Sequence, residues 1–168
     1  MNWSVVVPLH RLDRGAVRLS LAPTAEERAE AARVLALPAV DALSAEVTVS
    51  PWLDGATVAG RWRAAVQQTC GVTLEPFETE LEGDFAVNVV PPGSPNAPSE
   101  DPEQTIDLDA PDPPDVLARS EVDVAAYVVE HLALELDPFP RKPGVSWEPP
   151  KDDAPASPFA ALGRLKPQ

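Results

Sequence analysis

Cys70, His10 and His131 are the side chains of this 168-residue chain that most readily suggest nucleophilic or metal-binding chemistry. A thiol becomes a good nucleophile when a nearby histidine or cation lowers its pKa. The sequence that follows Cys70 is acidic instead, and the next basic residue downstream is Arg119. Because acidic neighbours disfavour the thiolate, we expect the pKa of Cys70 to be raised and the residue to be a buried part of a strand.

The two histidines and the single cysteine also form a poor set of metal ligands. They are spread along the chain, and neither histidine lies in an H-E-x-x-H or H-x-E motif. The sequence has no nucleophile elbow, phosphate-binding loop or dinucleotide-binding glycine motif. Its carboxylates cluster in Pro-rich sequence, whereas general acid–base catalysis needs carboxylates held rigidly in dry surroundings. We therefore expect no enzyme activity, no metal and no cofactor.

Arg61 and Arg63 flank Trp62, and basic residues interleaved with an aromatic residue can bind nucleic acid. However, seven Arg residues are balanced by seven acidic residues within residues 1–63. A solvated sheet face, or pairing of the two arginines with the acidic run "ETELEGD", is the alternative that we favour.

The negative charge of the chain, −14 in total, is concentrated in one third of its length. Residues 64–118 carry twelve Asp or Glu residues and no Lys or Arg. Such a surface repels phosphate and attracts basic partners; the alternative is that its acids serve solubility alone. The residues that we predict to contribute to a partner-binding surface are Asp107, Asp109, Asp112, Asp115 and Glu130.

Two helices and several strands are expected to position these groups. Residues 24–37 predict a helix with a capping box formed by Thr24 and Glu27. Residues 121–136 predict a core helix capped by Ser120. Alternation of apolar and polar residues predicts strands over residues 3–9, 44–53, 57–70, 76–81 and 84–90, the last two separated by a turn at Glu82-Gly83-Asp84.

The expected fold class is α+β, with a twisted, mainly antiparallel sheet and two principal helices. Closure of this sheet towards a barrel remains an alternative. We expect one domain over residues 1–140, interrupted by a mobile, Pro-rich acidic insertion at about 91–114 and followed by a Pro-rich tail over 141–168. A single cysteine and the lack of a long apolar run fit a cytoplasmic protein that does not cross a membrane.

Three segments of the sequence resemble the YceD family, whose members are called large ribosomal RNA subunit accumulation proteins. They are "TCGVTLEPFETELEGDFAV", "DLDAPDPPDVLARSEVDVAAYVVEHLALELDPFPRKPG" and "SPFAALGRLK". The resemblance covers roughly residues 60–168. It implies support of 23S ribosomal RNA accumulation or processing in the bacterial cytoplasm, from a gene that commonly neighbours that of a large-subunit ribosomal protein. It provides no established catalytic residues.

Many members of this family show C-x-x-C where this chain reads Cys70-Gly71-Val72-Thr73. Many also place His or Cys after the second helix, where this chain reads "FPRKPG". The resemblance therefore implies that Cys70 is the remnant of a pair, and that any metal site of those members is lost here.

Three functions follow as hypotheses. The first is a non-catalytic ribosome-biogenesis factor that binds a basic ribosomal protein or the pre-ribosomal large subunit, with direct contact to RNA left open. The second is a generic acidic adaptor unrelated to ribosomes. The third, a processing enzyme, lacks a cluster of carboxylates on rigid elements. Neither a membrane nor a small-molecule substrate is expected.

Overall fold

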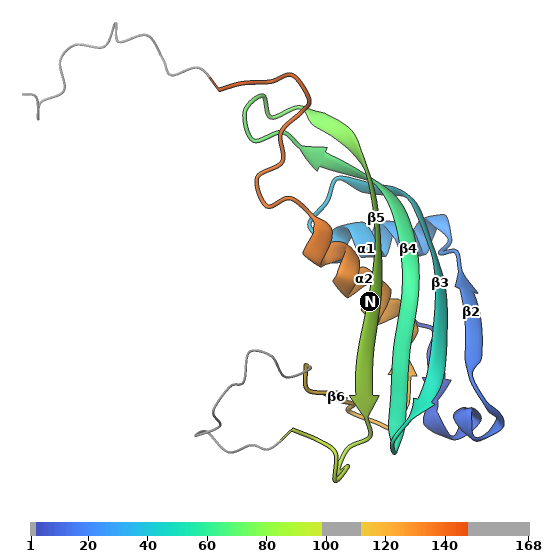
Figure 1. Cartoon of the computed structure of the whole chain (residues 1–168). Coiled ribbons are helices and arrows are strands. Elements are labelled where there is room, and N and C mark those ends of the chain that lie inside the picture. Colours follow the sequence, from blue (N-terminus) through green and yellow to red (C-terminus); the bar gives the residue numbers. More distant parts are fainter. Residues whose placement is uncertain (1–2, 99–111, 148–168) are drawn as a thin grey trace, which may run out of the picture.

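The structure, a computed structural model, describes residues 3–98 and 112–147, which contain two α-helices and a short 3-10 helix beside two sheets (Figure 1). In chain order the elements are β1 (Val6–Pro8), the short 3-10 helix η1 (Leu9–Arg14), β2 (Val17–Leu21), α1 (Ala25–Val34), β3 (Ala39–Trp52), β4 (Gly55–Thr69), β5 (Pro76–Val90), β6 (Asp115–Val116), β7 (Glu121–Asp123) and α2 (Val124–Glu135).

The main sheet has the strand order β2-β3-β4-β5-β6, and every neighbouring pair is antiparallel except β5 with β6. A second, two-stranded sheet joins β1 to β7. The expected α+β class and mainly antiparallel sheet are confirmed. The barrel alternative is wrong, because β2 and β6 end the main sheet as separate edges and do not pair with each other.

Both helices cover the same face of the main sheet, which leaves the other face open to solvent (Figure 1). Alternate residues of the strands point into one hydrophobic cluster with the apolar sides of α1 and α2. The buried strand residues include Val47, Val49, Val58, Trp62 and Val66. Since aromatic residues are scarce, valine, leucine and alanine fill most of this core. Strands β3 to β5 bury one side against the helices and expose the other.

Helix α1 confirms the capping box predicted from the sequence. The Glu27 N–H donates to Thr24 Oγ1 at 3.3 Å, and Glu27 Oε2 accepts from the Thr24 N–H at 2.7 Å. The helix ends three residues earlier than expected, because Ala36 adopts a positive φ of 53°. The Leu37 N–H then bonds back to the Ala32 carbonyl at 2.9 Å, which is a Schellman ending.

The start of α2 differs from the prediction. Residues 121–123 form strand β7, and Asp123 caps the helix in place of Ser120. Asp123 Oδ1 accepts from the Ala125 N–H at 3.2 Å and from the Val5 N–H at 3.0 Å. One carboxylate thus begins the helix and also ties it to the segment that leads into β1.

Strand β2 was not expected, and β5 is longer than expected. Residues Val17 and Leu19 alternate with Arg18 and Ser20 and pair with β3. Strand β5 runs without interruption through the segment where a turn was predicted at Glu82-Gly83-Asp84. The turn is therefore a wrong prediction, and the acidic residues on both sides of it line up on one continuous strand.

Candidate protein-binding surface

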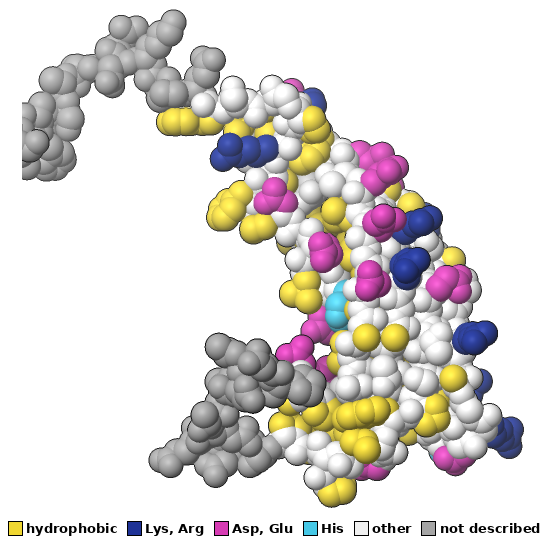
Figure 2. All heavy atoms as spheres, in the orientation of Figure 1, with side chains coloured by type: hydrophobic (Ala, Val, Ile, Leu, Met, Phe, Trp, Pro, Cys, Tyr) yellow, Lys and Arg dark blue, Asp and Glu magenta, His cyan; other side chains and the backbone are white. Residues whose placement is uncertain are grey.

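A row of carboxylates covers the solvent face of β5. The alternation along β5 turns Glu78, Glu80, Glu82 and Asp84 outward and Phe77, Thr79, Leu81 and Phe85 towards the helices. We call the first four residues the acidic row. Figure 2 shows acidic side chains following one another along this part of the sheet. Placing them on one long strand spaces the carboxylates regularly, about 7 Å apart.

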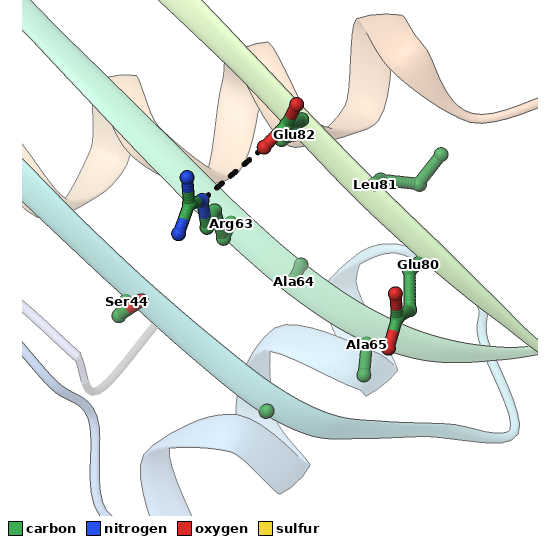
Figure 3. A pocket seen from close by; sticks show the side chains of 8 residues that line it. Ser44, Arg63, Ala64, Ala65, Glu80, Leu81 and Glu82 are labelled. Carbon is green, nitrogen blue, oxygen red and sulfur yellow. Dashed lines mark hydrogen bonds and ion pairs between the residues drawn. The ribbon is translucent and has the colours of Figure 1, made fainter.

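Basic residues of the neighbouring strand lie opposite only half of the acidic row. Arg63 on β4 lies opposite Glu82, and its Nε is 3.2 Å from Glu82 Oε2 (Figure 3). Arg61 lies opposite Asp84 in the register. Glu78 and Glu80 lie opposite the neutral residues Gln67 and Ala65. The pairing of an arginine with the acidic run is thereby confirmed, and the start of β5 keeps the larger negative charge.

The exposed face is unsuitable for stacking nucleic-acid bases. Trp62 points into the core and is only 1% exposed, while Arg61 and Arg63 point to solvent. An aromatic platform for bases has to be accessible on one face of the ring. The arrangement of Arg61, Trp62 and Arg63 therefore reflects the alternation of a strand, and the nucleic-acid interpretation of this motif is wrong.

A second acidic group forms where β6 meets α2. The hydroxyl of Tyr127 donates to Asp115 Oδ2 at 3.1 Å. Burial raises the pKa of Tyr127 above its usual range, and the negative charges of Asp115 and Glu130 add to this effect. Asp115 and Glu130 therefore act on the same phenol, although they are fifteen positions apart in the sequence. We call these three residues the Asp115 cluster.

The Asp115 cluster and the acidic row both border strand β5, the row on its solvent face and the cluster beside α2. Asp115 pairs with Val89 at the end of β5. Helix α2 contacts the middle of β5 through His131, whose ring stacks on Phe85 with a centroid distance of 4.4 Å. The Nδ1–H of His131 donates to the Tyr127 carbonyl at 2.8 Å, which fixes the ring next to the Asp115 cluster. Strand β5 thus connects the two acidic groups.

Of the five residues predicted to bind a partner, Asp115 and Glu130 both lie near Tyr127, and Asp115 accepts its hydrogen bond. Asp112 is exposed just before β6. Asp107 and Asp109 lie outside the described residues. Sequence reasoning missed Tyr127, the chain's single tyrosine, because its partner Asp115 lies twelve positions earlier in an irregular segment.

Cys70 is fully buried under a turn that holds the end of β4 against the segment after α2. Its Sγ accepts from the Thr73 N–H at 3.5 Å and from the Lys142 N–H at 3.4 Å. These donors, with Lys142 the largest contributor, lower the pKa of Cys70 to about 6. The buried position is confirmed. The expected rise in pKa is wrong, because main-chain dipoles at the sulfur outweigh its acidic surroundings.

The turn around Cys70 is held by further contacts to the same segment. The Gly71 N–H donates to the Pro140 carbonyl at 2.8 Å, and Lys142 Nζ lies 3.0 Å from Glu75 Oε2. No group of three potential metal ligands occurs within residues 3–98 and 112–147. Across these same residues, no helix is long and apolar enough to span a membrane.

Comparison with protein families identifies residues 58–166 as a match to the model described as Large ribosomal RNA subunit accumulation protein YceD. The chain belongs to the YceD family. The matched region begins at Val58 in β4 and includes β5, β6 and α2, so both acidic groups lie within it. Searches of curated proteins and of solved structures found no match. The family name connects the chain with accumulation of the large-subunit ribosomal RNA.

Proposed function

We propose that this YceD-family chain supports 23S ribosomal RNA accumulation as a non-catalytic factor that binds a basic ribosomal protein or the pre-ribosomal large subunit. The single observation that carries the proposal is the concentration of acidic side chains around β5, with the acidic row on its solvent face and the Asp115 cluster beside α2. Acidic surfaces of this kind increase the association rate with basic partners through long-range attraction.

Direct binding to the RNA backbone has little support in the charges. Affinity for phosphates depends on Lys and Arg, which release counterions from the nucleic acid. Residues 64–118 contain neither, and Arg63 is already paired with Glu82. Proteins that bind RNA phosphates do so through Lys and Arg side chains, and an acidic surface attracts those same side chains. A protein partner therefore fits the charge distribution better than RNA does.

The proposal is tested by capture of the tagged chain from growing cells, with and without ribonuclease. We expect large-subunit ribosomal proteins to remain bound after ribonuclease treatment, and their affinity to fall steeply with salt. Recovery of 23S precursor without ribonuclease, together with ribosomal proteins that stay bound after the treatment, would indicate that the RNA is held through the protein partner. If the captured proteins were basic proteins in general, with no preference for ribosomal ones, the acidic adaptor would be the correct function.

A charge variant tests the contribution of the predicted binding residues. Changing Asp107, Asp109, Asp112 and Asp115 to Asn removes four negative charges with little change in shape. We expect slower association with the ribosomal partner, a flatter salt dependence and reduced 23S accumulation.

The matched control removes four charges from the first part of the chain by changing Asp13, Glu26, Asp41 and Glu46 to their amides. The amide oxygens can still accept the hydrogen bonds that Gln67 makes to Asp41 and Ser20 makes to Glu46. This control is expected to bind the partner as the unchanged protein does. Equal losses in both variants would mean that only net charge matters, and the proposed surface would be wrong.

A further inference from the structure

Strand β5 has a long edge with no strand beside it. On one side it pairs with β4 from Pro76 to Val89. On its other side, among residues 3–98 and 112–147, only β6 pairs with it, and only at Val89 and Val90. Within those residues no backbone hydrogen bond joins the rest of this edge to another segment. Within the described part of the chain, the outer main-chain groups of residues 77–88 therefore have no strand to pair with.

This free edge is long enough to bind a strand. Every second residue of an edge strand turns its N–H and C=O groups away from its neighbour. At about 3.4 Å per residue, residues 77–88 span roughly 40 Å. The short pairing with β6 shows that the edge accepts a strand in parallel orientation, and the Leu117 N–H continues it with a 2.9 Å bond to the Val90 carbonyl.

We propose that the free edge of β5 binds an extended basic segment of a protein partner, which adds to the sheet as a further strand. This inference rests on the proposed function and specifies how the partner is held. Strand addition provides affinity through the main chain, while the side chains on the two faces provide selectivity.

The outward face of the edge selects basic residues. Glu78 and Glu80 lie opposite Gln67 and Ala65, so neither faces a basic residue on β4. A Lys or Arg at the facing position of an added strand would lie next to each carboxylate. Because the carboxylates alternate with inward residues, the basic residues of the partner must also occupy alternate positions.

The inward face of the edge selects apolar residues. Phe77, Leu81 and Val87 point towards the helices but are only half-buried. Leu134 of α2 is 74% exposed. Figure 2 shows hydrophobic side chains at the margin of the sheet on the β5 side. The partner segment that fits both faces alternates Lys or Arg with apolar residues.

A second copy of the chain is a poor occupant of this edge. Pairing β5 with β5 would place two acidic rows on the same face of a continuous sheet. Like charges on neighbouring strands destabilise the pairing, and natural proteins use charge to prevent contacts between edges. The same carboxylates therefore disfavour self-association and favour a basic strand.

The test uses the full-length protein and a capped peptide of about eleven residues that alternates Lys with Val and Thr, which matches the length of the edge. Amide hydrogen exchange followed by NMR is the main measurement. We expect binding to protect every second amide of residues 77–88, because the other amides already bond to β4. A peptide of the same composition with its lysines in one block, and a peptide N-methylated at its interior amides, are expected to bind at least tenfold more weakly.

A pair of protein variants separates the acidic row from net charge. Changing Glu78 and Glu80 to Gln is expected to weaken binding of the alternating peptide about threefold to tenfold. The control changes the exposed residues Asp13 and Glu26 to their amides, with the same change in net charge and no expected loss.

The inference is overturned if the alternating peptide does not bind, or if it binds without period-two protection on β5. It is also overturned if the N-methylated and block peptides bind equally well. In those cases ribonuclease-resistant capture of ribosomal proteins would still support the proposed function, with the partner held elsewhere. If no ribosomal proteins were captured after ribonuclease treatment, the proposed function itself would be contradicted.

Discussion

Gly83 on β5 lies directly opposite Trp62 on β4, and a methyl group at Gly83 would lie 2.9 Å from Trp62 Cζ2. The indole is 1% exposed and is among the largest fully buried side chains of the core. The absence of a side chain at Gly83 leaves room for the edge of the indole to lie against the backbone of β5.

Gly83→Ala should destabilise the fold, because the indole is packed on its other sides and cannot move away freely. Overpacking of this kind costs about 1–3 kcal/mol of unfolding free energy. Urea unfolding followed by tryptophan fluorescence measures the loss. Gly71→Ala is the matched control, since its new methyl group would lie 3.7 Å from the Pro140 carbonyl oxygen, an ordinary contact. Equal stabilities for the two variants would contradict the role of Gly83.

The same glycine shows what could not be read from the sequence. Glu82-Gly83-Asp84 has the composition of a turn, and local composition alone supports that interpretation. The residue that requires the glycine is Trp62, which is distant along the chain and adjacent only in the sheet. Alternation correctly predicted the strands on both sides, but the reason for the glycine is a packing contact that only the pairing of β4 with β5 creates.

The start of α2 was misplaced for a similar reason. Ser120 and Asp123 are both good capping residues, so the sequence allows either. Residues 121–123 are instead held extended by β1, more than a hundred residues earlier. The buried stripe of α2 was predicted correctly, because Val124, Val128 and Leu132 follow helical spacing and depend little on distant pairing.

Asp123→Ala should destabilise the protein by about 1–2 kcal/mol, because it removes the acceptor for the Ala125 and Val5 N–H groups. Asp123→Asn keeps an oxygen at the same position and should lose less than half as much. Thermal or urea unfolding of both variants measures the difference. Similar losses for Ala and Asn would mean that the negative charge, and not the hydrogen bonds, matters at this position.

For the candidate surface, the sequence predicted the sign of the charge but not its arrangement. The excess of acids in residues 64–118 was evident. The placement of Asp115 against Tyr127 of α2 depends on how the segment of β6 lies beside that helix. No spacing rule links an irregular segment to a helix that follows it, so this cluster required the structure.

Tyr127 should ionise at a higher pH in the folded protein than in the unfolded protein. Its pKa is raised from the ordinary 10.0 by burial, and further by Asp115 and Glu130. Because the chain has one tyrosine, phenolate absorbance reports on this residue alone. At a pH near 11 the folded protein should show less phenolate than the protein in urea. Asp115→Asn should lower the pKa of Tyr127 but leave it above 10.0, since burial remains. An unchanged titration in this variant would contradict the contact.

Cys70 should make the stability of the protein depend on pH in a window from about 6 to 9. Its pKa falls from the ordinary 9.0 to about 6 on folding, mainly because of the Lys142 N–H. Between these values the unfolded thiol keeps its proton while the folded one has lost it, so unfolding takes up a proton and stability rises with pH. Below pH 6 both states hold the proton and this contribution disappears.

Cys70→Ser lacks this titration, and its urea midpoint should rise less than that of the unchanged protein between pH 6 and pH 8.5. The other titrating groups are the same in both proteins. The difference between their slopes of urea midpoint against pH therefore reports the titration of the thiol alone. The variant should also bind the ribosomal partner normally, since the side chain is fully buried. Parallel slopes would show that the main-chain donors at Thr73 and Lys142 do not stabilise a thiolate, and weaker binding by a folded variant would give Cys70 a role beyond packing.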